Sequence, residues 1–191
     1  MNSPATLTVL LQQAADGDHQ AFEQAFGLVY DELQVLAHAQ LRRESEGHTL
    51  NTGALVHEAY LRLEHGLPND LHDRAHFLAI AARAMRRVLV DHARKFHAGK
   101  RGGINHAVAV DSMDALPADI RDGRLIDLDE ALTRLASLDE RQARVVECRF
   151  FGGLTEEETA TALSIGLRTV KRDWAKARSW LYRELQPAAL A

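Results

Sequence analysis

The sequence predicts an all-α fold: two small helical domains joined by a flexible linker, with a helix-turn-helix in the C-terminal domain. Alanine and leucine, both good helix formers, are plentiful among the 191 residues, and β-branched residues are sparse. Nowhere do apolar and polar residues alternate for long, as they would in a half-buried strand. Apolar residues recur instead at steps of three and four, which is the spacing of one helix face.

The first two expected helices precede residue 40. Leu7, Leu10 and Leu11 begin the first amphipathic stretch. The second helix starts after Asp18, because this carboxylate can accept a hydrogen bond from an orphan backbone N–H. Its apolar side is formed by Ala21, Phe22, Ala25, Phe26, Val29, Leu33, Leu36 and Ala37.

Two further helices follow a break at residues 47–53. The first of them covers residues 54–63, and its apolar side consists of Leu55, Val56, Ala59, Tyr60 and Leu63. After a loop at residues 66–70, a long apolar helix runs from Ala75 to about Phe96 and ends at a group of glycines.

A linker is expected over residues 101–125, because residues 104–124 lack periodicity and contain a proline, a glycine and many aspartates. The second domain then covers residues 126–191. It begins with an apolar stripe of Leu128, Leu132, Leu135 and Leu138. A second apolar run, Val145 to Phe151, is closed by Gly152 and Gly153.

The predicted helix-turn-helix begins at a capping box formed by Thr155 and Glu158. A short helix reaches about Leu163, residues 164–166 form the turn, and a longer helix covers residues 167–185. The longer helix has a core face of Val170, Trp174, Ala177 and Leu181. In such motifs the second helix enters the major groove of DNA. The residues proposed to contact DNA are Arg168, Thr169, Lys171, Arg172, Lys176 and Arg178.

Charge is unevenly distributed, although the formal net charge is only −4. Residues 83–101 carry seven basic residues against one acid, and residues 168–183 carry six against one. Residues 111–130, between them, hold seven acids against two arginines. Two basic blocks separated by an acidic one indicate two phosphate-facing surfaces. The alternative is that these runs are solvated helix faces.

Several classes of protein are disfavoured. A single cysteine, Cys148, allows neither an internal disulfide nor a multi-cysteine metal site. The ten histidines are scattered, and His57-Glu58 lacks the second histidine of a zinc-protease motif. No glycine-rich phosphate loop or nucleophile elbow is present. No signal peptide is evident, and no stretch approaches the roughly 20 apolar residues of a membrane span. We therefore expect a cytoplasmic protein that is not an enzyme and uses no cofactor or metal.

Four segments resemble ECF (extracytoplasmic-function) sigma factors of the sigma-70 type. Residues 154–160 (LTEEETA) and 167–181 (LRTVKRDW, then ARSWL) resemble the fourth conserved region of that family. Residues 54–63 (ALVHEAYLRL) and 74–94 (RAHF through MRRVLVDHAR) resemble the second region. The order and spacing of these segments match the family across nearly the whole chain.

The resemblance implies a protein that binds core RNA polymerase and directs initiation at promoter DNA. Residues 1–100 would bind polymerase and melt the −10 element, and residues 126–191 would read the −35 element. The residues implied at the −10 element are Arg83, Arg86, Arg87, Asp91, Arg94 and Lys95. Those implied on or beside the polymerase-binding helix are Leu55, Val56, Glu58, Tyr60, Leu61 and Arg62.

The chain departs from the family pattern in two places. Many members carry an acidic cluster where this chain has the uncharged residues 51–54, a feature that it shares with the ALVHEAYLRL subgroup. In some members a phosphorylated threonine there restores negative charge. This chain has Gly53 at that position and Thr52 beside it, so a Ser/Thr kinase acting on Thr52, or an anti-sigma protein, is a hypothesis for regulation. In addition, the usual turn order of glycine, apolar residue and serine is reversed here, so Ser164 would take a mildly strained left-handed conformation.

Two other functions stay open. A helix-turn-helix repressor or activator could bind duplex DNA without polymerase, but it would not account for the basic helix or for residues 54–63. An interaction module that binds polymerase without reading promoters is the second alternative. If loss of the Arg168 and Lys171 side chains had no effect on promoter choice, that module would be favoured.

Overall fold

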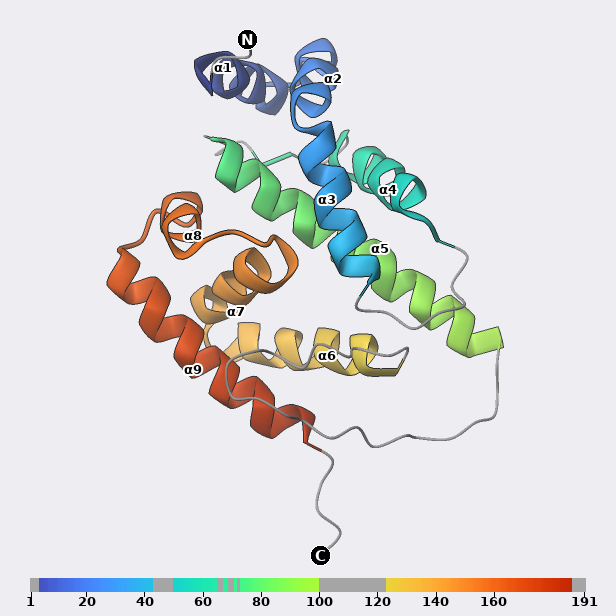
Figure 1. The fold of residues 1–191 in the computed structure, drawn as a ribbon, viewed down its shortest axis with the longest axis vertical. Helices are drawn as coiled ribbons and strands as arrows, with labels where there is room; N and C mark the ends of the chain where they lie inside the picture. The colour runs from blue at the N-terminus through green and yellow to red at the C-terminus, as the bar shows by residue number, and fades with distance from the viewer. Residues whose placement is uncertain are drawn as a thin grey trace, which may run out of the picture.

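The computed structural model describes the following residues: 4–42, 50–64, 67–68, 71, 73–99 and 123–186. Within these ranges the chain is helical and contains no strand, as the sequence predicts. Figure 1 shows α1 and α2 at the top and α6 lower down, with the long helix α5 running obliquely between the N-terminal helices and the C-terminal ones. No described helix has the length and apolar character needed to cross a membrane.

The N-terminal half contains five described helices: α1 (Pro4–Ala15), α2 (His19–Leu28), α3 (Tyr30–Leu41), α4 (Thr52–Glu64) and α5 (Arg74–Gly99). The predicted cap of α2 is present, since Asp18 accepts hydrogen bonds from the backbone N–H groups of Gln20 and Ala21 at 2.9 and 3.1 Å. Asn51 caps α4 in the same way through the N–H of Ala54, at 2.9 Å. Each cap satisfies backbone donors that the first helical turn leaves without a partner.

The single helix expected from Ala21 to Ala37 is two helices. The break lies at Val29, whose φ of −111° is not helical. The apolar spacing continues across the break because Val29 and Leu33 are buried on the same side as Phe22 and Phe26. Periodicity reports which side of a segment is buried, and it does not register one non-helical residue between two helices.

The largely aliphatic core of this half contains a cluster of aromatic rings. Phe22 and Phe26 of α2 surround Tyr60 of α4, with ring centroids 5.2 and 5.0 Å away. Phe77 of α5 is fully buried and meets Phe26 edge to face at 6.4 Å. Edge-to-face pairs of this kind contribute about 0.5–1.5 kcal/mol beyond the area they bury. These contacts fix α4 and α5 against α2, and so place the two segments that the sequence singles out.

The C-terminal half contains α6 (Gly123–Leu138), α7 (Glu140–Val146), the π-helix η1 (Glu147–Phe151), α8 (Glu156–Ala162) and α9 (Leu167–Leu185). The helix α6 begins at Gly123, inside the last residues of the predicted linker 101–125, and residues 101–122 lie outside the described residues. Leu128, Leu132 and Leu135 are buried as predicted, but Leu138 is 69% exposed. At 100° per residue, Leu138 has rotated to the edge of the stripe by the end of the helix.

The π-helix depends on Gly152. The backbone N–H of Gly152 donates to the carbonyl of Glu147 at 2.9 Å, which closes the wide i→i+5 turn. A Cβ at this position would stand 2.6 Å from the Cys148 carbonyl oxygen. Only glycine therefore fits here without displacing the backbone. Gly153 then turns the chain through φ of +61°, toward α8.

The connection between α8 and α9 is a tight turn. The expected capping box starts α8, with Thr155 and Glu158 exchanging hydrogen bonds at 2.9 and 3.1 Å. A Schellman motif ends it, in which Ser164 and Ile165 donate to the carbonyls of Thr161 and Ala160. Ser164 occupies the left-handed position at φ of 52°, as predicted, and Gly166 precedes α9 in an extended conformation.

The two halves are in contact through α5. This helix packs against α6, η1 and α8 as well as against α3 and α4. A buried hydrogen bond of 3.0 Å joins the Gln40 side chain of α3 to the carbonyl of Phe151 in η1. The hydrophobic core consequently continues from one half into the other.

The order of the turn residues can be tested by exchange. Ser164→Gly with Gly166→Ser should raise the free energy of unfolding by about 1 kcal/mol. Glycine removes the left-handed strain at position 164, and serine supplies the missing side-chain cap at position 166. Space around Gly166 is open, so the serine meets no obstacle. Urea unfolding measures the change. Ser164→Gly with Gly166→Ala is the matched control, which lacks the side-chain cap at position 166. If the single variant Ser164→Gly were less stable than the wild type, the inferred strain at Ser164 would be contradicted.

Candidate nucleic-acid interfaces

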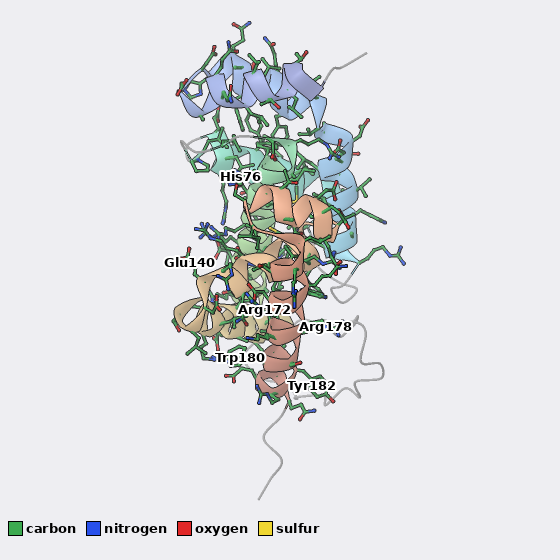
Figure 2. All side chains as sticks on the ribbon, turned by 90° about the vertical axis from the view of Figure 1, so that its left-hand side faces the viewer. His76, Glu140, Arg172, Arg178, Trp180 and Tyr182 are labelled. Atoms are coloured by element: carbon green, nitrogen blue, oxygen red, sulfur yellow. The ribbon has the colours of Figure 1, made fainter. Side chains whose placement is uncertain are left out.

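The outer face of α9 carries basic side chains. Arg168, Lys171, Arg172 and Lys176 are exposed, whereas Thr169 and Arg178 are half-buried. The opposite face packs on α6, α7 and α8 through Val170, Ala177 and Leu181, all fully buried. The helix lies along one edge of the molecule in Figure 1, and Figure 2 looks onto that side, with Arg172 and Arg178 labelled along it. The structure thus brings together the residues predicted on this helix.

Asp173 holds the buried face of α9 in place, and the sequence reasoning missed it. Its side chain is 1% exposed and accepts hydrogen bonds from Arg141 of α7 at 2.6 Å and from Arg172 at 3.1 Å. Burial alone would raise the pKa of Asp173, but the two guanidinium groups outweigh this effect and lower it. Its position between Val170 and Ala177, at helical spacing, was the available signal.

Trp174 is only half-buried, although the sequence places it on the core face. The guanidinium groups of Arg149 and Arg178 lie 5.3 and 5.8 Å from the Trp174 ring. Cations over an indole face are attracted by its negative π surface. Trp174 therefore orients Arg178 at the boundary between the buried and basic faces.

Most of the arginines predicted on α5 are paired with acids from the C-terminal half. Glu147 of η1 contacts Arg83 at 2.8 Å and Arg86 at 3.0 Å. Asp129 of α6 contacts Arg94 at 3.2 Å and Arg86 at 3.7 Å. We name these five side chains the arginine–carboxylate cluster. Sequence reasoning did not find it, although an acid inside the apolar run at 145–151 was a signal.

Arg86 is the buried centre of this cluster, with 7% of the residue exposed. Burial lowers its pKa, and Glu147 and Asp129 act in the opposite direction. Its guanidinium also lies 5.4 Å from the ring centroid of Phe151. Arg87 and Lys95, by contrast, are exposed. Asp91 instead forms an ion pair with Arg62 of α4 at 2.7 Å. Asp91 is predicted at the −10 element and Arg62 on the polymerase-binding helix, so this ion pair joins the two predicted sites.

The residues predicted on α4 divide into two groups. Leu55 and Val56 are buried in the core, whereas Glu58 and Arg62 are exposed and Leu61 is 42% exposed. Tyr60 is half-buried, and its pKa is raised by burial and by nearby glutamates. Thr52 is the first residue of α4, immediately after its cap.

The described residues hold no group of three or more histidine, cysteine or acidic side chains that could bind a metal ion. Cys148 is buried, and burial raises its pKa to about 12. A thiol held protonated in this way is a poor nucleophile and a poor metal ligand.

The contribution of Asp173 can be measured through its pH dependence. Asp173→Asn should lower the free energy of unfolding by about 1–2 kcal/mol near neutral pH, because a charge-assisted hydrogen bond is lost. The folded-state pKa is depressed, so this stabilisation exists above the ordinary pKa of 3.8 and disappears as the pH falls through the lower folded value. Urea unfolding at neutral and acidic pH should show that the difference in free energy of unfolding between the wild type and Asp173→Asn decreases as the pH falls. Asp127→Asn, on the exposed face of α6, is the control; equal stability of wild type and Asp173→Asn at neutral pH would refute the role.

A comparison with family models and with curated proteins places these features in context. The comparison with curated proteins gives no match. The model of the family described as ECF sigma factor matches residues 4–187, a range that contains every residue the structure describes. Both basic helices lie inside the matched range. The chain therefore belongs to the ECF sigma factor family, and it is a sigma factor that directs RNA polymerase to initiate transcription at promoters.

Proposed function

We propose that α9 reads the −35 promoter element, that α5 contacts the −10 element during melting, and that α4 docks on core RNA polymerase. The corresponding division is residues 1–100 for polymerase and the −10 element, 101–125 as linker, and 126–191 for the −35 element. The protein then acts in the cytoplasm, where core polymerase and promoter DNA are its partners. It performs no chemistry of its own.

The observation that carries the −35 assignment is the asymmetry of α9. Its apolar face is anchored by Val170, Ala177 and Leu181, and Asp173 adds a buried ion pair to the anchor. A helix held so firmly on one side can present the other to a major groove without reorienting. Arginine near the helix start suits guanine through two parallel hydrogen bonds, and lysines further along suit phosphates. Arg168 lies near the start of α9 and is the candidate for a guanine contact. Lys176 lies further along and is the candidate for a phosphate contact.

The −10 assignment uses a helix that is basic on one side and anchored in the core on the other. Arg87 and Lys95 are exposed and available to a DNA backbone. Arg83, Arg86 and Arg94 have the right charge but are engaged with Glu147 and Asp129 in the structure. These three arginines can bind DNA only when their ion pairs with the two carboxylates are broken.

For polymerase docking, the exposed side of α4 offers a mixed surface. Leu61 supplies an apolar contact, and Glu58 and Arg62 flank it with charges of both signs. Leu55 and Val56 support this surface from the core. A partly apolar patch with charged neighbours is typical of protein interfaces.

Run-off transcription tests the proposal as a whole. Purified core polymerase and a fragmented genomic library should give new, discrete start sites only when the protein is added. Tight binding to duplex DNA without initiation would instead support a repressor or activator.

Two substitutions on α9 separate base reading from phosphate contact. Arg168→Ala should cost about 1–3 kcal/mol at one base position and relax preference there. Lys176→Ala should weaken binding evenly across sequences and lower the slope of binding against salt by about one unit. Holoenzyme binding to a randomised −35 library measures both. Unchanged sequence preference in Arg168→Ala would refute the assignment of that residue.

We also propose that an anti-sigma protein or a Ser/Thr kinase regulates the activity of this sigma factor. Phosphorylation of Thr52 would place about −1.5 to −2 charges at the start of α4, where a helix N-terminus favours an anion. Mass spectrometry of an active polymerase complex tests this, and an unmodified Thr52 there would rule it out.

A further inference from the structure

We propose that Asp173 is a positioning residue for DNA binding: its buried carboxylate holds Arg141 of α7 and Arg172 of α9 together as a clamp for one phosphate of the DNA backbone. This inference rests on the proposed role of α9 at the −35 element. It adds Arg141, which lies outside the helix-turn-helix, to the DNA-binding surface. It also gives Asp173 a function in binding besides its contribution to stability.

One carboxylate bonds two guanidinium groups that come from different helices. Nε of Arg141 donates to Oδ2 of Asp173 at 2.6 Å, and Nε of Arg172 donates to Oδ1 at 3.1 Å. Because both oxygens belong to the same carboxylate, the two guanidinium groups lie close together. Each guanidinium also carries Nη donors, and such donors bind phosphate oxygens in the same pattern as carboxylate oxygens. The pair can therefore receive an anion between its Nη groups.

The clamp is buried on its inner side and exposed on its outer side. The Asp173 side chain is 1% exposed, whereas those of Arg141 and Arg172 are 46% and 55% exposed. DNA at this surface meets the guanidinium groups and not the carboxylate. The hydrogen bond to Asp173 raises the pKa of Arg141, so this guanidinium keeps its charge. The three side chains together carry one net positive charge at a fixed place.

Stability alone does not account for both hydrogen bonds. The bond from Arg141 joins α7 to α9 and so supports the packing of these two helices. The bond from Arg172 joins neighbouring residues of one helix, so it connects no two elements. Side chains of adjacent helix residues normally point away from each other. The effect of this second bond is to fix the guanidinium of Arg172 at the exposed edge of α9.

A fixed guanidinium is well suited to a phosphate. A long side chain loses rotamer freedom when it binds, and a side chain that is already held loses less. Phosphates carry no sequence information, and contacts with them set the register of a protein on the duplex. Arg168, the candidate for base reading, is exposed and forms no ion pair with another described residue. The clamp would thus place α9 on the duplex while Arg168 adjusts to a base edge.

Two physical effects predict opposite outcomes for Asp173→Asn. The loss of a negative charge near DNA should by itself strengthen binding, because it reduces repulsion of the phosphates. The loss of the clamp should weaken binding, because the amide offers one acceptor oxygen where the carboxylate offers two. We expect the second effect to dominate, with binding weakened about tenfold. The slope of binding against salt should also fall by about one unit, since one phosphate contact is lost.

The experiment measures binding of holoenzyme, made from core polymerase and the full chain, to a promoter duplex recovered by run-off transcription. Affinities over a series of salt concentrations are compared for the wild type, Asp173→Asn and the charge control Glu156→Gln. Glu156 lies 3.6 Å from Lys171, so the control removes a carboxylate from the same basic face and leaves the clamp intact. It should bind as tightly as the wild type or more tightly.

The salt slope separates positioning from a purely structural role. If Asp173→Asn only unfolded part of the protein, affinity would fall with the folded fraction and the slope would stay that of the wild type. An unchanged slope in Asp173→Asn, at any affinity, would therefore overturn the proposal.

A second pair of variants keeps the test valid if Asp173→Asn does not fold. Arg141→Gln should lower the salt slope by about one unit. Arg144→Gln removes the same charge from α7, at an exposed residue whose partner Glu140 lies in the same helix, and should leave the slope unchanged. Equal slopes for these two variants would contradict the clamp.

Failure of the clamp and failure of the −35 assignment give different results. If Arg168→Ala keeps its sequence preference on the randomised −35 library, the −35 role of α9 is refuted and the clamp falls with it. If Arg168→Ala loses that preference while Asp173→Asn and Arg141→Gln keep the wild-type salt slope, the clamp alone is refuted.

Discussion

The packing of α5 between helices from both halves is the constraint on which the rest of the structure depends. One side of this helix is aliphatic and aromatic, and it forms the core with α3 and α4. The other carries arginines that find acids on α6 and η1. One helix therefore takes part in the packing of both halves.

Helix positions and caps could be predicted from the sequence because they depend on local chemistry. Asp18, Thr155 and Glu158 act within one turn of their own helices, so their roles follow from spacing alone. The break at Val29 could not be predicted, because the buried side continues through it. The strain at Ser164 could be predicted, since it depends on only one turn.

Of the six residues predicted on α9 to contact DNA, Arg168, Lys171, Arg172 and Lys176 are exposed and Thr169 and Arg178 are half-buried, while their contacts with DNA stay a prediction. What the sequence could not reveal is the state of the α5 arginines. Charge counting identified a basic segment but placed the balancing acids in residues 111–130 as a whole. Among the described residues of that segment, 123–130, Asp129 alone lies in the arginine–carboxylate cluster, and Glu147 comes from an apolar run. Long-range pairing depends on tertiary structure, which periodicity and composition do not encode.

The π-helix at Glu147–Phe151 determines how Phe150 and Phe151 are rotated about the helix axis relative to α7. An ordinary α-helix advances by 100° per residue, so the loss of one residue here would turn Phe150 and Phe151 by about that angle. The flanking helices would survive such a deletion, yet the carbonyl that receives Gln40 would point elsewhere. Alignment of the two halves thus depends on the length of a five-residue segment, which makes this segment far less tolerant of insertions and deletions than its modest size suggests.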